Sequence, residues 1–371
     1  MFFGPGQNDD VFAPIDNAGD RIALERVTVP SLSFPIDPFL GLAATTGNSP
    51  RAVDEHRVDQ YANQFSVSIQ QALPHRFVTQ IGYVGNKGYQ MLDRNNINLI
   101  DPATGRRPLP QFGRVDIKSS ESNTTFHGLQ LSLQRPFTAG FLFGAQYMWS
   151  HAFDVGSLGG GESQEPQNAA CRQCEFGTTN QDIRHTLTVN WVYELPFGRD
   201  RQSLAESGLL QHVFGGWQLS GVMQARTGRP LTITVNRGTG DLPDGNNRNQ
   251  RPDVVAGVDP YPATPTPDQW LNIAAFAVPA RGTWGNAGRN ILRGPGLLQL
   301  DVALQKRFTI SGSRNFQFRW EAFNVFNRMN LGNPGTNISA PAQFGRITGP
   351  LNSNYGTGTA RQMQFMFRIN F

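Results

Sequence analysis

The stretch Met363-Gln364-Phe365-Met366-Phe367-Arg368-Ile369-Asn370-Phe371 decides the fold of this chain. Its residues Met363, Phe365, Phe367, Ile369 and Phe371 are apolar and alternate with mainly polar ones. A period of two is that of a β-strand with one apolar face and one polar face. Terminal aromatic strands of this kind are typical of outer-membrane β-barrels, in which lipid covers the apolar face. We expect this stretch to act as the assembly signal that the barrel-assembly machinery reads.

The same alternation recurs along the chain. Its apolar positions fall within residues 65–69, 77–83, 129–133, 141–149, 187–195, 217–235, 298–304 and 316–320. With the terminal stretch they predict about nine strands, each near the ~9–11 residues that cross a bilayer when tilted. The alternate positions carry mostly polar residues, which suit a water-filled lumen. The sequence therefore predicts an all-β fold, an antiparallel transmembrane β-barrel of the outer-membrane type, present here as a partial barrel.

The connections between these strands alternate in length. Short turns are expected at 74–76, 135–139 and 309–315, a moderate connection at 196–215, and long loops at 86–124, 152–182, 237–296 and 328–360. Outer-membrane barrels combine short periplasmic turns with long extracellular loops. Counted back from a periplasmic carboxy-terminus, every long loop falls on the extracellular side, so the strand assignment is self-consistent.

Composition limits the classes of function. Of the 371 residues 38% are hydrophobic and 16% are charged, with 40 Gly and 25 Pro, a mixture that suits strands, turns and loops better than helical bundles. No stretch approaches the ~20 apolar residues of a transmembrane helix. The net charge of +4 comes from scattered arginines rather than from a basic run, so no nucleic-acid partner is expected.

Several short phrases occur in the order and spacing of a known barrel family. They are YVGNKG at 83–88, HGLQL at 127–131, YMWSH at 147–151, DIRH at 182–185, YELPFG at 193–198, GGWQLS at 215–220, GRN at 288–290, LRGPG at 292–296 and RWEAFNVFN at 319–327. Through these phrases the chain resembles the carboxy-terminal barrel region of Oar-like TonB-dependent transporters, receptors that carry a carboxypeptidase-regulatory-like domain.

The resemblance implies a place in the outer membrane of a Gram-negative cell, in contact with lipid and lipopolysaccharide. It implies that the wall and the extracellular loops capture a large unknown ligand for energised uptake, driven by a TonB complex that pulls on a plug. Family members also have a signal peptide, a regulatory-like β-domain and a plug inside a barrel of about 22 strands. Residues 1–371 match none of these amino-terminal parts, so we expect them to be the carboxy-terminal portion of such a transporter.

Two residue pairs are candidate structural sites. Cys171 and Cys174 form a CxxC in a long loop, and without a βαβ pattern or a second CxxC a local disulfide is favoured over a redox or zinc site. Arg319 and Glu321 share the lumen side of the penultimate strand. We expect them to pair within the wall or to contact a plug, and we expect no cofactor.

An acidic loop is a candidate calcium site. Asp241, Asp244 and Asp253 lie in a loop rich in Gly and Asn. Their spacing does not match the calcium loop of EF-hands, whose ligands recur at every second position. A solvated loop is therefore the favoured interpretation.

Three histidines near strand ends could belong to a catalytic set. His127, His151 and His185 lie in sequence near Ser150, Asp154 and Asp182. No GxSxG nucleophile elbow accompanies them. Histidines at the membrane rim are the favoured interpretation, and no enzyme activity is expected.

Two other classes of protein stay open at this point. A passive porin-type channel shares every barrel feature, and it differs by lacking a plug and a TonB box upstream. A soluble secreted β-rich binding module would instead stay in solution without detergent.

Overall fold

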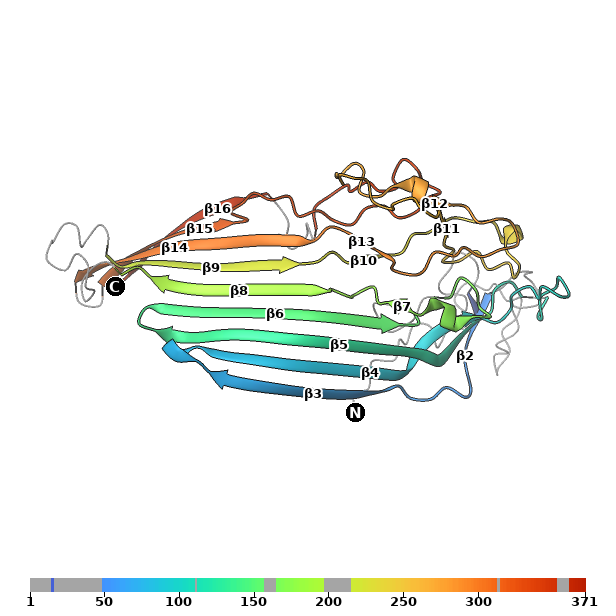
Figure 1. The fold of residues 1–371 in the computed structure, drawn as a ribbon, viewed down its shortest axis with the longest axis horizontal. Coiled ribbons are helices and arrows are strands. Elements are labelled where there is room, and N and C mark those ends of the chain that lie inside the picture. Colours follow the sequence, from blue (N-terminus) through green and yellow to red (C-terminus); the bar gives the residue numbers. More distant parts are fainter. Residues whose placement is uncertain are drawn as a thin grey trace, which may run out of the picture.

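The computed structural model describes residues 15–16, 49–110, 112–156, 165–196, 215–311, 314–351 and 360–371. Its largest unit is one curved sheet of long strands that lie side by side (Figure 1). Along the sheet they follow the order β3 (Tyr61–Ala72), β4 (Val78–Asn96), β5 (Asp116–Thr138), β6 (Phe141–Asp154), β8 (His185–Glu194), β9 (Trp217–Arg226), β14 (Leu297–Ser311), β15 (Arg314–Phe323) and β16 (Gln362–Asn370). Each is antiparallel to its neighbours.

Short elements lie beyond the ends of the long strands. β1 (Ile15–Asp16) pairs with β2 (Ser49–Val53), β2 runs parallel to the start of β5, and β7 (Gly177–Thr178) pairs with the end of β6. β10 (Pro230–Leu231) pairs with β13 (Leu292–Arg293), and β11 (Asp253–Val254) with β12 (Phe276–Ala277). The described residues include the 3-10 turns η3 (Pro74–Arg76), η4 (Arg172–Glu175), η5 (Thr239–Asp241) and η6 (Ile273–Ala275). Within the described ranges no helix is both long and apolar enough to cross a membrane.

The strand register gathers the alternating apolar residues on one face of the sheet. Leu131 lies opposite Ile81 on one side and opposite Tyr147 on the other, and Tyr147 lies opposite Leu187. Directly paired residues point to the same side of a sheet, so these residues form rows across the strands. We call this side the outer face. The opposite side, which carries residues such as Gln130, is the lumen face.

Among the described residues, no protein layer covers the outer face. Val67, Ile69 and Phe367 are 66%, 75% and 65% exposed. A soluble sheet must bury such a face against another layer, whereas lipid covers it in a membrane barrel. In the described part of the chain, β3 and β16 each pair on one side only. The predicted outer-membrane fold is therefore confirmed, as an open section of a barrel.

Glycines in the strands make room for aromatic side chains from neighbouring strands. The ring of Phe65 lies over Gly85, directly opposite, where any Cβ would overlap it. Trp191 lies over Gly221 in the same way, between β8 and β9. Cross-strand contacts of this kind fix the register of a sheet, which explains glycines at positions where strand propensity alone disfavours them.

One predicted strand was wrong. The alternation over 217–235 predicts a single long strand, but β9 ends at Arg226 and the chain leaves the sheet. Pro230 lacks the N–H group that a continuing ladder needs. The apolar residues Leu231, Ile233 and Val235 are instead buried in a separate core formed by the loops.

One predicted long loop was also wrong in its bounds. The region 86–124 was expected to be a loop, yet β4 continues to Asn96 and β5 begins at Asp116. Here polar residues such as Ser119 and Ser122 are only 4% and 3% exposed, so the hydrophobic alternation that marks a strand is absent. Most of the expected connection at 196–215 lies outside the described residues.

Candidate functional site

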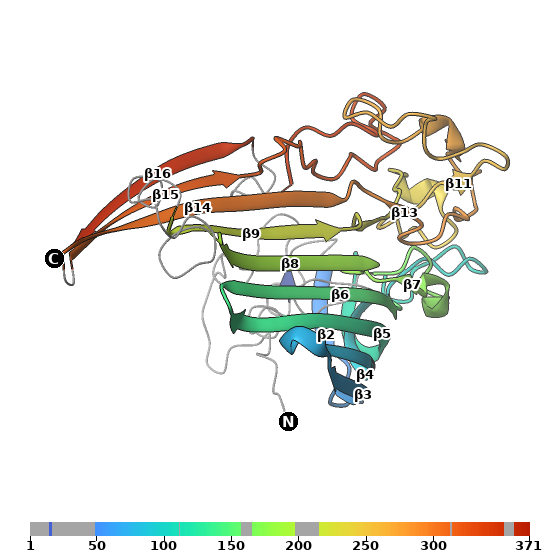
Figure 2. The same ribbon diagram turned by 60° about the vertical axis from the view of Figure 1, so that its left-hand side comes forward.

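Three loop segments fold together at one end of the sheet into what we call the outer cap: residues 165–182, 227–296 and 328–351. Leu231, Ile233, Val235, Leu271, Ala275, Phe276, Leu292, Ile338 and Phe344 form its hydrophobic core. Figure 2 shows β11 and β13 of the cap beyond the end of β9. The loops on this side of the barrel therefore have a compact core of their own.

A disulfide turn joins the cap to the sheet of long strands β3–β6, β8, β9 and β14–β16, which we call the wall. Cys171 and Cys174 are bonded, with their Cα atoms 5.3 Å apart, around η4. Between them Arg172 places its Nη2 atom 2.7 Å from Asp93 Oδ2 and donates a hydrogen bond of 3.1 Å to the carbonyl of Arg94. Asp93 and Arg94 lie near the carboxyl end of β4, so the turn ties the loop to the end of that strand next to the cap.

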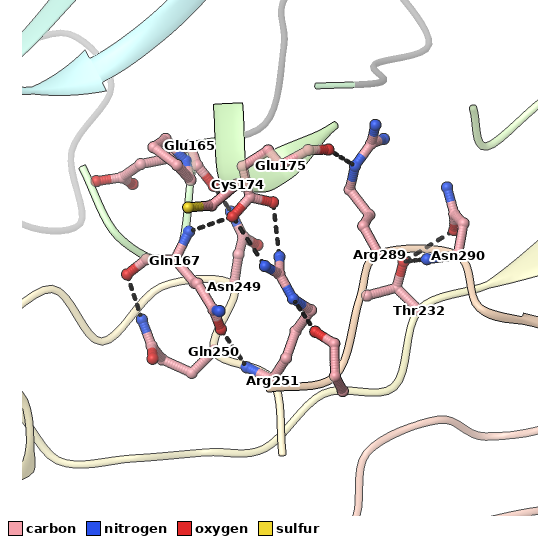
Figure 3. Close-up of polar contacts among 12 residues, drawn as sticks. Glu165, Gln167, Cys174, Glu175, Thr232, Asn249, Gln250, Arg251, Arg289 and Asn290 are labelled. Carbon is pink, nitrogen blue, oxygen red and sulfur yellow. Dashed lines mark hydrogen bonds and ion pairs between the residues drawn. The ribbon is translucent and has the colours of Figure 1, made fainter. Parts of the chain in front are cut away.

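The residue after the second cysteine forms a buried ion pair. Arg251 Nη1 donates to Glu175 Oε2 at 2.6 Å, and Arg251 Nη2 donates to Glu175 Oε1 at 3.0 Å (Figure 3). The Gln167 backbone N–H also donates to this carboxylate, at 3.1 Å. Glu175 and Arg251 are 4% and 3% exposed. A bidentate pair with an additional donor is the arrangement that makes two buried charges tolerable.

Two more arginines connect the cap to the loop side of β6. Arg289 forms an ion pair with Asp154 at the end of β6, and its Nε donates to the Glu175 carbonyl at 3.0 Å. Arg293 forms an ion pair with Asp182, whose Oδ1 accepts from the backbone of Ala152 at 2.8 Å. These contacts hold the cap in one position relative to the wall.

A polar cavity of about 340 Å³ lies between these cap segments. Its lining includes Glu165, Glu175, Asn180, Thr232, Thr234, Asn249, Arg251, Arg289, Asn290, Asn333 and Thr336. Glu165 is 5% exposed and its Oε1 atom has no hydrogen-bond partner. Burial raises the pKa of the Glu165 carboxyl above its usual range, and the charge of Arg114 opposes that shift. The cavity therefore has the size and polarity for part of a polar ligand.

A second cavity, of about 500 Å³, lies on the lumen face where β4, β5 and β6 approach the loops. Its lining combines the apolar residues Met91, Phe126, Met148 and Ile183 with polar groups. Ser122 also lines it, and the Ser122 hydroxyl is buried without a hydrogen-bond partner. This surface is a second place at which the lumen could hold a ligand or another segment of protein.

Arg319 and Glu321 lie side by side on the lumen face of β15. Arg319 Nε donates to Glu321 Oε1 at 2.8 Å, and the other oxygen of Glu321 accepts from Gln364 on β16. Glu321 lies opposite Gln364 in the strand register. The pair lines a shallow cavity of about 450 Å³ together with Asp301 and Ser220. Whether a plug contacts it stays a prediction.

The possible catalytic set is not assembled. His151 and Ser150 are neighbours on β6, so their side chains point to opposite faces of the sheet. The Ser150 hydroxyl donates to the Ile183 carbonyl at 3.0 Å, while His151 Nε2 lies 3.1 Å from Thr178 Oγ1. Asp154 and Asp182, the candidate acids of that set, form ion pairs with arginines of the cap instead.

The acidic loop also forms no metal site. Asp241, Asp244 and Asp253 each accept a hydrogen bond from a different backbone N–H, those of Gly238, Asn246 and Asn286. In the described part of the chain, no group of three or more His, Cys, Asp or Glu side chains is placed to hold a metal ion. The expectation of a solvated loop was wrong for Asp244, which is 7% exposed because the cap folds over it.

The terminal strand β16 pairs with β15 along its whole length, from Gln362 opposite Phe323 to Asn370 opposite Asn315. Its outward residues Phe365 and Phe367 are 63% and 65% exposed, and Phe371 is 92% exposed. The aromatic side chains are thus available at the edge of the sheet. Their role as an assembly signal stays a prediction.

Sequence reasoning missed the arginine–carboxylate network of the cap. Glu175 and Arg251 are 76 positions apart, and Asp154 and Arg289 are 135 apart. No local spacing connects such residues. The only signal in the sequence is that GRN and LRGPG, two of the phrases behind the family resemblance, contain Arg289 and Arg293.

Comparison with protein families identifies the class of this molecule. The model of the outer membrane beta barrel domain matches residues 7–364. The chain therefore belongs to this family, and its place is the outer membrane of a Gram-negative cell. No curated protein sequence matches it.

Among solved structures, the chain is similar to large outer-membrane proteins at low sequence identity. The outer membrane transporter YddB from Escherichia coli is 9% identical with a TM-score of 0.46, over 88% of this chain and 36% of that one. The FrpB iron transporter from Neisseria meningitidis is 11% identical with a TM-score of 0.42, over 87% and 33%. The pyoverdine receptor FpvA from Pseudomonas aeruginosa is 11% identical with a TM-score of 0.41, over 84% and 30%. The chain thus spans about a third of the length of these proteins.

Proposed function

We propose that this chain forms the carboxy-terminal wall and the extracellular loops of a TonB-dependent receptor that takes up a large ligand. The observation that supports this most is the chain direction of the two strands at the edges of the sheet. β3 and β16 are the first and last of the consecutive antiparallel strands, and both run away from the cap (Figure 1). Closure with antiparallel pairing throughout therefore needs an odd number of further strands. A barrel of about 22 strands would supply about 13.

The cap and the lumen face of the wall both fit this function. The cap would form part of the extracellular capture surface, and its polar cavity would hold part of the ligand. Below it, the lumen face with Arg319 and Glu321 would border the path along which a plug is moved. No catalytic group is needed for this task, because the energy comes from the TonB complex in the inner membrane.

The terminal strand would serve assembly rather than transport. We propose that the assembly machinery recognises its exposed aromatic residues. Phe367→Ala combined with Phe371→Ala in the full-length parent should strongly reduce the amount of folded protein in the outer membrane. The lumen-facing Arg368→Ala serves as the control, and equal assembly of both variants would contradict this role.

The experiment that tests the transport proposal is to sequence the genomic DNA upstream of Met1 in the same reading frame. The proposal expects a signal peptide, a TonB box, a plug and further strands. A stop codon and a promoter directly upstream would contradict it, and further strands without a plug or TonB box would favour a passive channel instead.

A further inference from the structure

Two tyrosine–histidine pairs on the outer face have nearly the same geometry. Tyr83 Oη lies 2.7 Å from His127 Nδ1, and Tyr147 Oη lies 2.7 Å from His185 Nδ1. In both pairs the ring centroids are 6.1 Å apart, with interplanar angles of 21° and 22°. The first pair joins β4 to β5 and the second joins β6 to β8. Such a repetition along one surface needs a common cause.

The strand register provides that cause. His127 lies opposite Gly85, two positions beyond Tyr83, and His185 lies opposite Trp149, two positions beyond Tyr147. Both contacts are therefore diagonal contacts on one face of an antiparallel pair. In both, the histidine is one row nearer to the cap than its tyrosine. The imidazoles consequently lie toward the end of the outer face that is next to the loops.

These pairs lie where the apolar part of the outer face ends. Tyr83, Leu129, Trp149 and His185 form one row across the sheet, and the next row toward the loops contains His127 opposite His151. The next row away from the loops is mainly apolar, with Ile81, Leu131 and Leu187. Tyr and Trp mark the interface between hydrocarbon and head groups in barrels. The histidines thus lie at the level of the extracellular head groups.

The hydrogen bonds also orient the imidazoles. In the tautomer that suits an anionic partner, the tyrosine hydroxyl donates and Nδ1 accepts. Nε2, on the side of the ring away from the tyrosine, then carries a proton. Both His127 and His185 are exposed. In this tautomer each pair presents one N–H donor on the outer face.

A cation lies in the adjoining row. Lys87 lies opposite Thr125, one row beyond His127 toward the loops, and so on the same outer face. Its ammonium group lies 5.1 Å from the centroid of the Tyr89 ring, which stacks on Tyr61 at 5.0 Å. N–H donors together with an ammonium group are the partners that phosphate oxygens prefer.

We propose that Tyr83, Lys87, His127, Tyr147 and His185 bind the phosphorylated sugar head group of the glycolipid of the outer leaflet. This rests on the proposed function in that the cap marks the extracellular side. The apolar rows below the donors would receive the acyl chains, which selects a lipid over a soluble phosphate. The two histidines are separated by two strand spacings, roughly 10 Å across the sheet, so they would contact different parts of one head group. The tyrosines are positioning residues.

The test uses the full-length parent protein that contains this chain, extracted from outer membranes and placed in phosphatidylcholine nanodiscs that contain either bisphosphorylated lipid A or lipid A stripped of phosphate. Native mass spectrometry counts the lipid A molecules retained. Loss of the two donors in the His127→Leu/His185→Leu variant should weaken retention of the phosphorylated form about ten-fold. His75→Leu, in the turn at the opposite end of the wall, is the matched control and should change nothing.

A second variant separates positioning from packing. Tyr83→Phe/Tyr147→Phe keeps every ring but removes the hydroxyls that orient the imidazoles, and it should give a smaller loss, again for the phosphorylated lipid only. Equal retention of both lipids by the unchanged full-length protein would overturn this inference and leave the transport proposal intact. A full-length protein that enters neither nanodisc would overturn the membrane placement and with it both proposals.

Discussion

The wall and the outer cap are built on opposite principles. In the wall, large apolar side chains such as Ile69 and Phe367 are 75% and 65% exposed, and each is supported only by its neighbours in the sheet. In the cap, Ile233 is 0% exposed and lies in a core that resembles that of a small soluble domain. Charges follow the same division, because Glu175 and Arg251 pair inside the cap, whereas Arg319 and Glu321 pair on the lumen face of the wall.

The difference shows what each region does with apolar surface. The wall leaves its apolar surface to lipid, so its protein–protein stability comes from backbone pairing and cross-strand contacts. The cap lies in water and must bury its own apolar residues. A substitution should therefore have different effects in the two regions even when the residue type is the same.

The largest effect is expected from breaking the buried ion pair of the cap. Arg251→Met leaves Glu175 buried without its partner, which costs about 3–5 kcal/mol. Proteolytic cleavage within residues 227–296 should become much faster. The control is Arg346→Met, since the pair of Arg346 with Asp268 is exposed (55% and 86%) and such pairs are worth about 0–1 kcal/mol. Similar cleavage rates in the two variants would contradict a cap held by buried charges.

The second comparison uses the same substitution in both regions. Ile233→Ala leaves a cavity in the cap core and should destabilise the cap by about 2–5 kcal/mol. Ile69→Ala on the outer face leaves no cavity in the protein, because lipid fills the space, and its effect should be much smaller. Hydrogen exchange of the cap and wall amides measures both. A larger effect at Ile69 would reverse the assignment of the two regions.

The third comparison concerns adjacent positions on one strand. Val189→Arg places a charge on the outer face near the middle of β8 and should cost about 2–4 kcal/mol in a membrane. Thr188→Arg points to the lumen and should be tolerated. Urea unfolding in lipid vesicles measures the difference, and equal stabilities would show that neither face meets lipid.

The smallest effect is a pH dependence of the cap. Burial raises the pKa of Asp244, and its hydrogen bonds oppose this. A raised carboxyl pKa means that this group favours folding below its unfolded pKa, and that the contribution is lost as the pH rises through its folded pKa. The protection of the cap from proteolysis should therefore decline slightly as the pH is raised from acid to neutral. Asp244→Asn should flatten the profile, and Asp241→Asn, at a half-exposed position of the same loop, is the matched control.

The fold could be predicted from the sequence wherever contact with lipid requires apolar residues at every second position of a strand. The alternation from Leu187 to Tyr193 is local, and the structure places it on the outer face as expected. The same reasoning failed at Ile233, because alternation does not reveal whether lipid or a loop core receives the apolar side chains. It also failed at Ser119 and Ser122, where polar strand ends are buried under loops. The arginine–carboxylate network of the cap could not be predicted from local sequence patterns, because Glu175 and Arg251 meet only after the chain has folded.

The most direct test of the central claim, that one face of the wall meets lipid, is cysteine labelling along β8. Single cysteines at Leu187, Thr188, Val189 and Asn190 are exposed in cell envelopes to a water-soluble maleimide, and Cys171 and Cys174 are already bonded to each other. We predict reaction at 188 and 190 and protection at 187 and 189. Equal reaction at all four positions would show that the sheet is surrounded by water and would contradict the account.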